Sequence, residues 1–231
     1  LFPALEKLGH TVLPSRPALA PLLVNLGSLR ALQGVRLDAG VTLWDGSRRL
    51  GSTVGNLIFT EWGLNGPAVM DLSHLVSAHG GPGLELSLNL LARVQAEYDR
   101  LLSAKRSSDL PLKVFLGAFF PPKVSAHYLR MVRLPDHLPL RDLGGGDLKR
   151  LTALLTDTRL PVKGTREFEY CQVSAGGVPV TEVDPRTLQS LRVEGLFLTG
   201  ETLDVVGPCG GYNLQYAFSS GALAGRAAAK V

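Results

Sequence analysis

The alternation of apolar and polar residues changes its period along the chain. From about residue 25 to 90, short runs alternate with period two, which predicts β-strands, and Asp45-Gly46 between two runs predicts a tight hairpin. From about 91 to 158, apolar residues recur every three to four positions, which predicts helices. Alternation returns from about 159. This order predicts a small barrel or curled sheet with a helical subdomain.

The last third of the chain has the pattern of a strand, a glycine-rich loop and a helix. The apolar run at 196–198 predicts a buried strand that ends just before Glu201. Gly210-Gly211 then precede a proline-free, alanine-rich stretch, 212–230, which predicts a helix. A helix start next to glycines favours an anionic ligand, because its N–H groups are unpaired and carry positive charge. An ordinary strand-to-helix connection is the alternative.

Several short segments also occur in a characteristic order. They are SAGGV at 174–178, TEVDPRTL at 181–188, GE at 200–201, LDV at 203–205, GGYN at 210–213, FTEWGLNGPA at 59–68, and LGHTV at 8–12 with PAL at 17–19. Together they resemble a bacterial family of FAD-dependent flavoproteins, the HI0933-like or aminoacetone-oxidase-like NAD(P)/FAD-dependent oxidoreductases. The resemblance spans nearly the whole chain. It implies an α/β fold in which a Rossmann-like FAD-binding domain is interrupted by an inserted β-barrel-like domain with a helical subdomain.

The resemblance also implies domain boundaries. Residues 1–24 and 166–231 are expected to be segments of the FAD-binding domain, and 25–165 to be the insert, with its helical subdomain at about 91–158. A full-length family member would begin with a strand, a glycine-rich loop and a helix that hold the FAD pyrophosphate. No such motif is found here, so we expect a fragment that binds FAD poorly and is inactive alone.

FAD is the cofactor that the resemblance implies, and its expected ligands lie in the C-terminal third. Gly176-Gly177 would pass close to the isoalloxazine ring, where a side chain would collide with it, or would form a plain hairpin turn. Glu201 would bind ribose or ribityl hydroxyls. The predicted cofactor-binding residues are Gly176, Gly177, Gly200, Glu201, Asp204, Gly210, Gly211, Tyr212, Asn213, Leu214 and Gln215. No catalytic base is evident from the sequence.

Two positions depart from the family pattern. Cys209 stands where the family usually has threonine, and Val206 where it usually has aspartate. Cys209 is either a redox partner of the flavin or a small residue that fills space, and a lone cysteine favours the second interpretation. The departures affect the prediction of the substrate more than that of FAD.

Composition narrows the possible partners. Hydrophobic residues make up 45% of the chain and charged residues 19%, which is typical of a globular protein. The net charge is +4, without a run of five or six basic residues, so we expect no nucleic-acid partner. No apolar run approaches a membrane span, and the histidines and two cysteines form no metal motif. His10 is expected to be structural, and the cytoplasm is the default location.

The sequence therefore predicts part of a FAD-dependent oxidoreductase. Its substrate would be a small molecule that the sequence does not identify, with NAD(P)H or oxygen as redox partner. The alternative is a non-catalytic binding module with a vestigial flavin site. Neither the substrate nor the oligomeric state follows from these residues.

Overall fold

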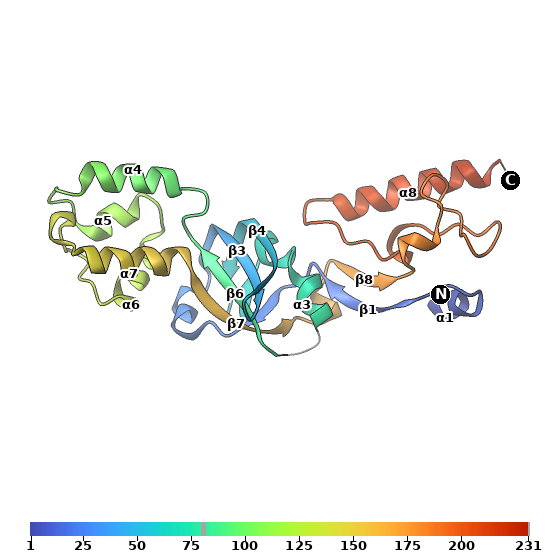
Figure 1. Cartoon of the computed structure of the whole chain (residues 1–231), viewed down its shortest axis with the longest axis horizontal. Helices are drawn as coiled ribbons and strands as arrows, with labels where there is room; N and C mark the ends of the chain where they lie inside the picture. Colours follow the sequence, from blue (N-terminus) through green and yellow to red (C-terminus); the bar gives the residue numbers. More distant parts are fainter. Residues whose placement is uncertain (80–81, 231) are drawn as a thin grey trace. The chain divides into compact units, whose positions relative to one another are not determined.

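The computed structural model describes residues 1–79 and 82–230, and the chain forms two compact units (Figure 1). Unit 1 comprises Leu1–Pro21, Ser73–Gly80 and Thr165–Val231. Unit 2 comprises Leu22–Leu72 and Gly81–Gly164. Each unit is thus assembled from segments that are far apart in the sequence, and each has its own buried apolar core.

Unit 2 contains a closed six-stranded barrel, which confirms the predicted barrel. Its strands follow the order β2-β5-β4-β3-β6-β7 and are antiparallel wherever partners are recorded. Side chains at alternate positions of β3, including Val41 and Leu43, are fully buried inside it. The bounds are β2 Leu22–Val24, β3 Arg36–Asp45, β4 Arg48–Phe59, β5 Gly63–Asn65, β6 Leu84–Asn89 and β7 Thr158–Thr165.

The predicted helical region, also in unit 2, forms four helices with an aromatic centre. The rings of Tyr98, Phe115 and Phe119 lie 5.4 to 5.6 Å apart in tilted or edge-on pairs. The bounds are α4 Gln95–Lys105, α5 Leu112–Gly117, α6 Pro122–Met131 and α7 Gly145–Thr156, with the 3-10 turn η2 Leu140–Asp142 between α6 and α7. The short helices η1 Gly27–Leu32 and α2 Pro67–Met70 lie elsewhere in the unit. Helix α6 packs against both α5 and η1.

Unit 1 is built around a two-stranded antiparallel ribbon, β1 Leu13–Ala18 with β8 Val173–Gly177, and the long helix α8 Tyr212–Ala228. Its core joins Leu5 near the N-terminus to Leu198, Leu203 and Ala224 near the C-terminus. The remaining elements are α1 Phe2–Lys7, α3 Ser73–His79, η3 Phe168–Tyr170, η4 Val180–Glu182 and η5 Gly200–Thr202. Within residues 1–79 and 82–230, no helix combines the length and the apolar character that a membrane span requires.

Two local predictions in unit 1 need correction. The apolar run at 196–198 is not a strand, because only Phe197 forms an isolated bridge, to Gln189, and no pairing continues on either side. Its Leu198 is nevertheless buried in the core. The hairpin-turn alternative for Gly176-Gly177 is also wrong, since both glycines belong to β8. The predicted C-terminal helix is confirmed as α8, which ends two residues earlier than expected.

Candidate functional site

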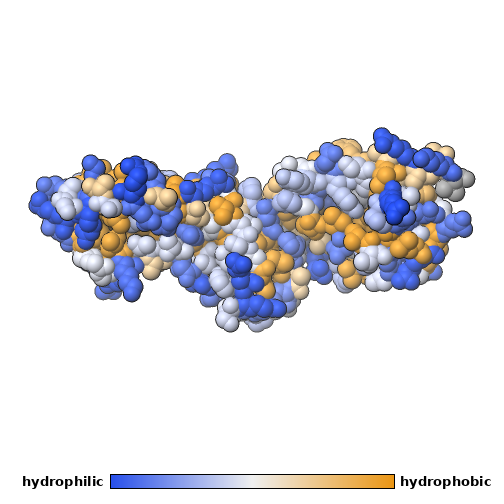
Figure 2. All heavy atoms as spheres, turned by 45° about the horizontal axis from the view of Figure 1, so that its top comes forward, coloured by the Kyte–Doolittle hydropathy of each residue, from blue (hydrophilic) through white to orange (hydrophobic). Residues whose placement is uncertain are grey.

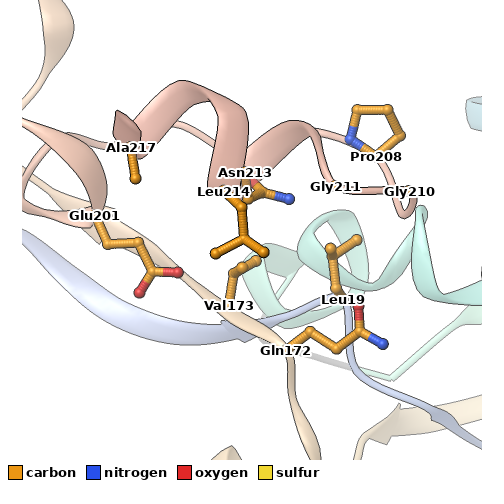
Figure 3. Close-up of a pocket in the computed structure, with 10 residues that line it drawn as sticks. All are labelled: Leu19, Gln172, Val173, Glu201, Pro208, Gly210, Gly211, Asn213, Leu214 and Ala217. Carbon is orange, nitrogen blue, oxygen red and sulfur yellow. The ribbon is translucent and has the colours of Figure 1, made fainter. Parts of the chain in front are cut away.

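A pocket of about 350 Å³ opens beside the first turn of α8, and residues of unit 1 form all of its recorded lining (Figure 3). Its volume is at the lower end of the range for small-molecule sites. Figure 3 shows Glu201 on one wall, Leu214 and Val173 facing each other, and the Gly210-Gly211 loop along the rim. The lining consists of Leu19, Gln172, Val173, Glu201, Pro208, Gly210, Gly211, Asn213, Leu214 and Ala217.

The start of α8 leaves its backbone accessible at the pocket. Gly210 and Gly211 have φ angles of +122° and +91°, a region that L-residues rarely adopt. A Cβ at Gly211 would meet no atom within 4 Å, so the backbone here faces open space. No side chain caps the helix. The first-turn N–H groups therefore remain available to a ligand at the positive end of the helix.

Asn213 fixes the shape of the loop before α8. Its Oδ1 accepts a hydrogen bond from the Gly207 N–H at 2.8 Å, and its Nδ2 donates to the Gly207 carbonyl at 2.9 Å. The side chain thus satisfies both backbone groups of one loop residue. The sequence analysis listed Asn213 as a cofactor-binding residue, and the structure shows its amide bonded to the loop backbone.

Replacing Asn213 with alanine should loosen this loop, because it removes both hydrogen bonds to Gly207. We expect a loss of about 1–2 kcal/mol in local stability. Hydrogen exchange measured on peptides that cover 207–215 should then be roughly tenfold faster. The matched control is Gln215→Ala, which removes only an exposed bond to Ser219 and should change exchange little. Equal acceleration in both variants would contradict the role assigned to Asn213.

Polar and apolar groups lie on different walls of the pocket. The Glu201 carboxylate is exposed and accepts a hydrogen bond from the Ser174 hydroxyl at 3.3 Å, which leaves acceptor capacity for ligand hydroxyls. Leu19 and Val173 provide apolar surface. Leu19 is held at φ +47°, an uncommon conformation for leucine. Strained backbone of this kind is enriched at ligand sites.

Gly176 and Gly177 serve chain packing and do not line the pocket. Their φ angles are +99° and +102°. A Cβ at Gly176 would lie 2.8 Å from the Pro14 carbonyl carbon, and one at Gly177 would lie 2.6 Å from the Thr202 oxygen. The Gly176 N–H donates to Asp204 Oδ1 at 2.7 Å. The protein's own backbone thus accounts for both glycines, and their approach to a flavin stays a prediction.

The pocket brings together five of the eleven predicted residues and leaves six outside. The five are Glu201, Gly210, Gly211, Asn213 and Leu214, whereas Gly176, Gly177, Gly200, Asp204, Tyr212 and Gln215 are outside the lining. Sequence reasoning did not assign Leu19, Gln172, Val173, Pro208 and Ala217 to the site. Leu19 ends the PAL segment at 17–19, so that signal was present, but it did not indicate a contact with the start of α8.

A second polar cluster lies within unit 1, around His10. His10 Nδ1 is 2.7 Å from Glu182 Oε2, and Ser190 Oγ is 2.8 Å from His10 Nε2. A serine, histidine and acid in this order resemble a nucleophilic triad. However, Ser190 Oγ already accepts two backbone N–H bonds, from Arg192 and Val193, and all three triad-like residues are buried. The cluster therefore supports the structural role expected for His10.

Glu182 is the centre of this cluster. Its carboxylate accepts hydrogen bonds from Arg192, from the Thr11 N–H and from His10, which together lower its pKa from 4.5 to about 2 against the opposing effect of burial. Because an ionised carboxylate only accepts hydrogen bonds, His10 donates to Glu182 from Nδ1. The cluster thus joins the N-terminal segment to residues 182–193.

Metal chemistry receives no support from the described part of the chain. Among residues 1–79 and 82–230, no group of three or more His, Cys, Asp or Glu side chains is placed to hold a metal ion.

Comparison with known proteins establishes the family. The model of the HI0933-like protein Rossmann domain matches residues 1–227. The chain belongs to the HI0933-like family. This agrees with the resemblance found in the sequence, and it describes the domain as a Rossmann domain, which in this chain accompanies a closed barrel.

The curated relatives differ in the activity for which they are named. The chain is 35% identical over 230 residues to a 3-dehydro-bile acid delta(4,6)-reductase of Clostridium scindens, covering 97% of this chain and 56% of the relative. It is 35% identical over 222 residues to a ribosomal RNA dihydrouridine synthase of Escherichia coli, with coverage of 93% and 52%. A protein of the same name from Haemophilus influenzae is 30% identical over 218 residues. The chain spans little more than half the length of these curated relatives.

Proposed function

We propose that the chain is part of a FAD-dependent oxidoreductase and that the pocket at the start of α8 forms part of its flavin site. The observation that carries the proposal is the uncapped, glycine-lined helix start facing a pocket with a carboxylate on its wall. In this proposal, residues 1–24 and 166–231 belong to the flavin-binding domain, and 25–165 form a domain inserted into it.

The groups in the pocket fit a dinucleotide with a planar ring. The N–H groups of the first turn of α8 suit an anionic group, and Glu201 suits sugar hydroxyls. Leu19, Val173 and Leu214 offer apolar contact to a ring. Because a dinucleotide is an extended ligand, a pocket of about 350 Å³ would hold only one part of it.

Protein residues would bind and orient the cofactor. A bound flavin supplies hydride chemistry, and reduction of a carbon–carbon double bond, with NAD(P)H providing the reducing equivalents, is compatible with the names of both kinds of relative. The positive end of α8 would stabilise negative charge at the pocket rim. Asn213 would keep the loop open by holding Gly207. Leu19 and Val173 would limit the access of water.

Helix α8 also exposes an apolar face that we propose is covered in the whole protein. Leu214 and Phe218 lie one turn apart on the same face of the helix, and the two residues are 66% and 73% exposed. Figure 2 shows apolar surface open to solvent on the part of the molecule that contains α8. The relatives are nearly twice as long as the matched region. We propose that a segment of the whole protein corresponding to the unmatched part of the relatives packs against this face and contributes the remaining FAD contacts.

Flavin binding should depend on Glu201. We expect Glu201→Ala to weaken FAD binding about tenfold, because it removes a charged acceptor of hydroxyl hydrogen bonds. Titration of FAD, followed by its fluorescence and visible absorbance, measures the effect. It should be done on the 231-residue chain, where we expect weak binding, and on a version extended to the length of the relatives.

The matched control is Glu194→Ala, which removes an exposed acid of unit 1 that does not line the pocket. It should leave the FAD affinity unchanged. No flavin binding by either length of chain, at saturating FAD, would rule out the oxidoreductase and leave the binding module with a vestigial site. Equal weakening of FAD binding by Glu201→Ala and Glu194→Ala would indicate that the flavin does not bind in this pocket.

A second candidate concerns the substrate, which we propose to be RNA in place of a free small molecule. The specific observation in its favour is the uneven distribution of charge. Unit 2 carries 17 Lys and Arg residues against 12 Asp and Glu, whereas unit 1 carries 7 against 8. A basic unit suits a phosphate-rich substrate better than an apolar one. Two relatives are named for activity on ribosomal RNA, which agrees with this alternative.

A further inference from the structure

Unit 1 contains a second pocket, of about 350 Å³, at the C-terminal end of α8. Three cations, Arg186, Arg226 and Lys230, belong to its recorded lining, and that lining contains no aspartate or glutamate. Unit 1 as a whole carries 7 Lys and Arg residues against 8 Asp and Glu. The positive charge of the second pocket therefore does not follow from the composition of the unit.

The three cations of the second pocket are available to a ligand. Within the described ranges, 1–79 and 82–230, no ion pair and no side-chain hydrogen bond is recorded for Arg186, Arg226 or Lys230. Lys7 and Arg16 of the same unit also have no recorded ion pair there, but they do not line this pocket. Arg226 and Lys230 offset the negative end of the α8 dipole, whereas Arg186 comes from another segment and adds charge beyond that need.

One wall of the second pocket is a face of α8 and of the turn that follows it. Leu223, Arg226 and Lys230 recur at intervals of three and four positions, which places them on one face. Leu214, which lines the pocket at the start of α8, precedes Leu223 by nine positions, or two and a half turns. The two leucines thus leave opposite sides of the helix, and the second pocket is separate from the proposed flavin site.

A tight turn, about 40 residues earlier in the sequence, forms the other wall. The Arg186 N–H donates to Asp184 Oδ1 at 2.7 Å, and the Asp184 N–H donates to the Gln189 carbonyl at 2.9 Å, which closes the turn. Leu188 within it has a φ of +60° and is buried in the core of unit 1. A strained residue of this kind persists only where the surrounding structure enforces it. Arg186 and Gln189 are therefore presented to the pocket by a fixed backbone.

The charge of the second pocket fits a phosphate monoester. Such a group carries a charge of about −1.5 to −2 at pH 7 and three acceptor oxygens, which three cations from two walls can share. A carboxylate has one charge and would leave the cations incompletely neutralised. Arginine also binds phosphate through two parallel hydrogen bonds, and the pocket has an arginine on each wall.

The uncharged part of the lining fits a planar ring. Phe197 and Leu223 supply apolar surface beside the cations. No side-chain hydrogen bond is recorded for Gln189 in the part of the chain that the structure describes, so its amide can donate to and accept from a polar ring edge. A cavity of about 350 Å³ is also within the size range of sites for small organic molecules, and is larger than a bare phosphate ion needs.

We propose that the second pocket binds a small phosphate monoester that carries a planar ring, which is the chemistry of a mononucleotide. The cations hold the phosphate, and Phe197 and Leu223 contact the ring. This site goes beyond the flavin proposal and does not depend on it, because the two pockets share no lining residue. Since one end of the ligand is bound by charge and the other by apolar contact, full affinity should require both the phosphate and the ring.

The test measures binding of adenosine 5′-monophosphate (AMP) to the 231-residue chain by isothermal titration calorimetry, with adenosine and inorganic phosphate as partial ligands. The pocket variant is Arg186→Gln with Arg226→Gln, which removes one cation from each wall. The matched variant is Arg48→Gln with Arg100→Gln, which removes two exposed arginines of unit 2 that are paired with acids. Glu201→Ala tests whether AMP occupies the proposed flavin pocket. Far-UV circular dichroism checks that each variant folds.

We expect AMP to bind about tenfold or more tightly than either partial ligand, and the pocket variant to bind AMP about tenfold or more weakly than the wild type. The matched variant and Glu201→Ala should each change the affinity for AMP less than about twofold. Equal losses in the pocket and matched variants, no AMP binding by the folded wild-type chain, or equal affinities for AMP and inorganic phosphate would overturn the proposal. Loss of AMP binding in Glu201→Ala would also overturn it. FAD titration tests the flavin proposal separately, so the two proposals can fail independently.

Discussion

Replacing Gly176 with alanine is expected to destabilise unit 1 by about 3 kcal/mol or more. The new Cβ would lie 2.8 Å from the Pro14 carbonyl carbon, which belongs to the paired strand and cannot rotate away as a side chain could. In addition, a φ of +99° is strained for alanine. The two costs add, because relieving the clash would require breaking the pairing of β1 with β8.

The two units can be followed separately during urea denaturation. Both tryptophans, Trp44 and Trp62, belong to unit 2, so tryptophan fluorescence reports on that unit alone. Far-UV circular dichroism reports on both units. Gly176→Ala should move the circular-dichroism transition of unit 1 to lower urea and leave the fluorescence transition in place. A shift of both transitions together would show that the units unfold as one and would contradict this localised effect.

Gly225→Ala is the matched control for Gly176→Ala. Gly225 lies inside α8 of the same unit, its φ is not positive, and a Cβ there would meet nothing within 4 Å. Alanine is a better helix former than glycine, so this variant should be unchanged or more stable by up to about 1 kcal/mol. Destabilisation of similar size in both variants would mean that the packing of Pro14 against β8 is not the cause.

Local patterns predicted the fold where pairing partners are close in sequence. The hairpin at Asp45-Gly46 was predicted because the turn and both strands lie within one short stretch. The run at 196–198 was predicted as a strand and is not one, since strand formation depends on a neighbouring segment that local patterns do not reveal. The same limit applies to His10, whose acidic partner Glu182 is 172 positions away.

The candidate site was predicted where motif and geometry coincide. Glu201, Gly210 and Gly211 belong to the motif and also line the pocket. Gly176 was selected from the same motif, but its backbone conformation and its contact with Pro14 explain a glycine there without any ligand. A motif thus contains residues that ligand binding requires and residues that chain packing requires. Only the contacts in the folded structure distinguish the two. Leu19 is the opposite case. It lies between β1 and β2, was not predicted as a site residue, and is brought to the pocket by the fold.

Replacing Glu182 with glutamine is expected to cost unit 1 about 2 kcal/mol at pH 7. Each carboxylate oxygen accepts hydrogen bonds, Oε1 from Arg192 and the Thr11 N–H, and Oε2 from Thr11 and His10. A glutamine amide must turn its NH₂ group toward donors on one side, so at least one hydrogen bond is lost in either orientation. The circular-dichroism transition of unit 1 in urea measures the change.

The pH dependence of the stability difference between the wild type and Glu182→Gln distinguishes the effect of the Glu182 charge from that of its shape. The folded-state pKa of about 2 is below the ordinary 4.5, so the wild-type carboxylate contributes fully above pH 4.5 and loses its contribution as pH falls toward 2. Glutamine does not ionise. The stability gap between the wild type and Glu182→Gln should therefore be largest near pH 7 and should shrink between pH 4.5 and 2. Glu194→Gln, which changes an exposed acid of the same unit, should show almost no gap at any pH. A stability difference between the wild type and Glu182→Gln that stays constant down to pH 2 would mean that the polar cluster around His10 depends on side-chain shape and not on an ionised carboxylate.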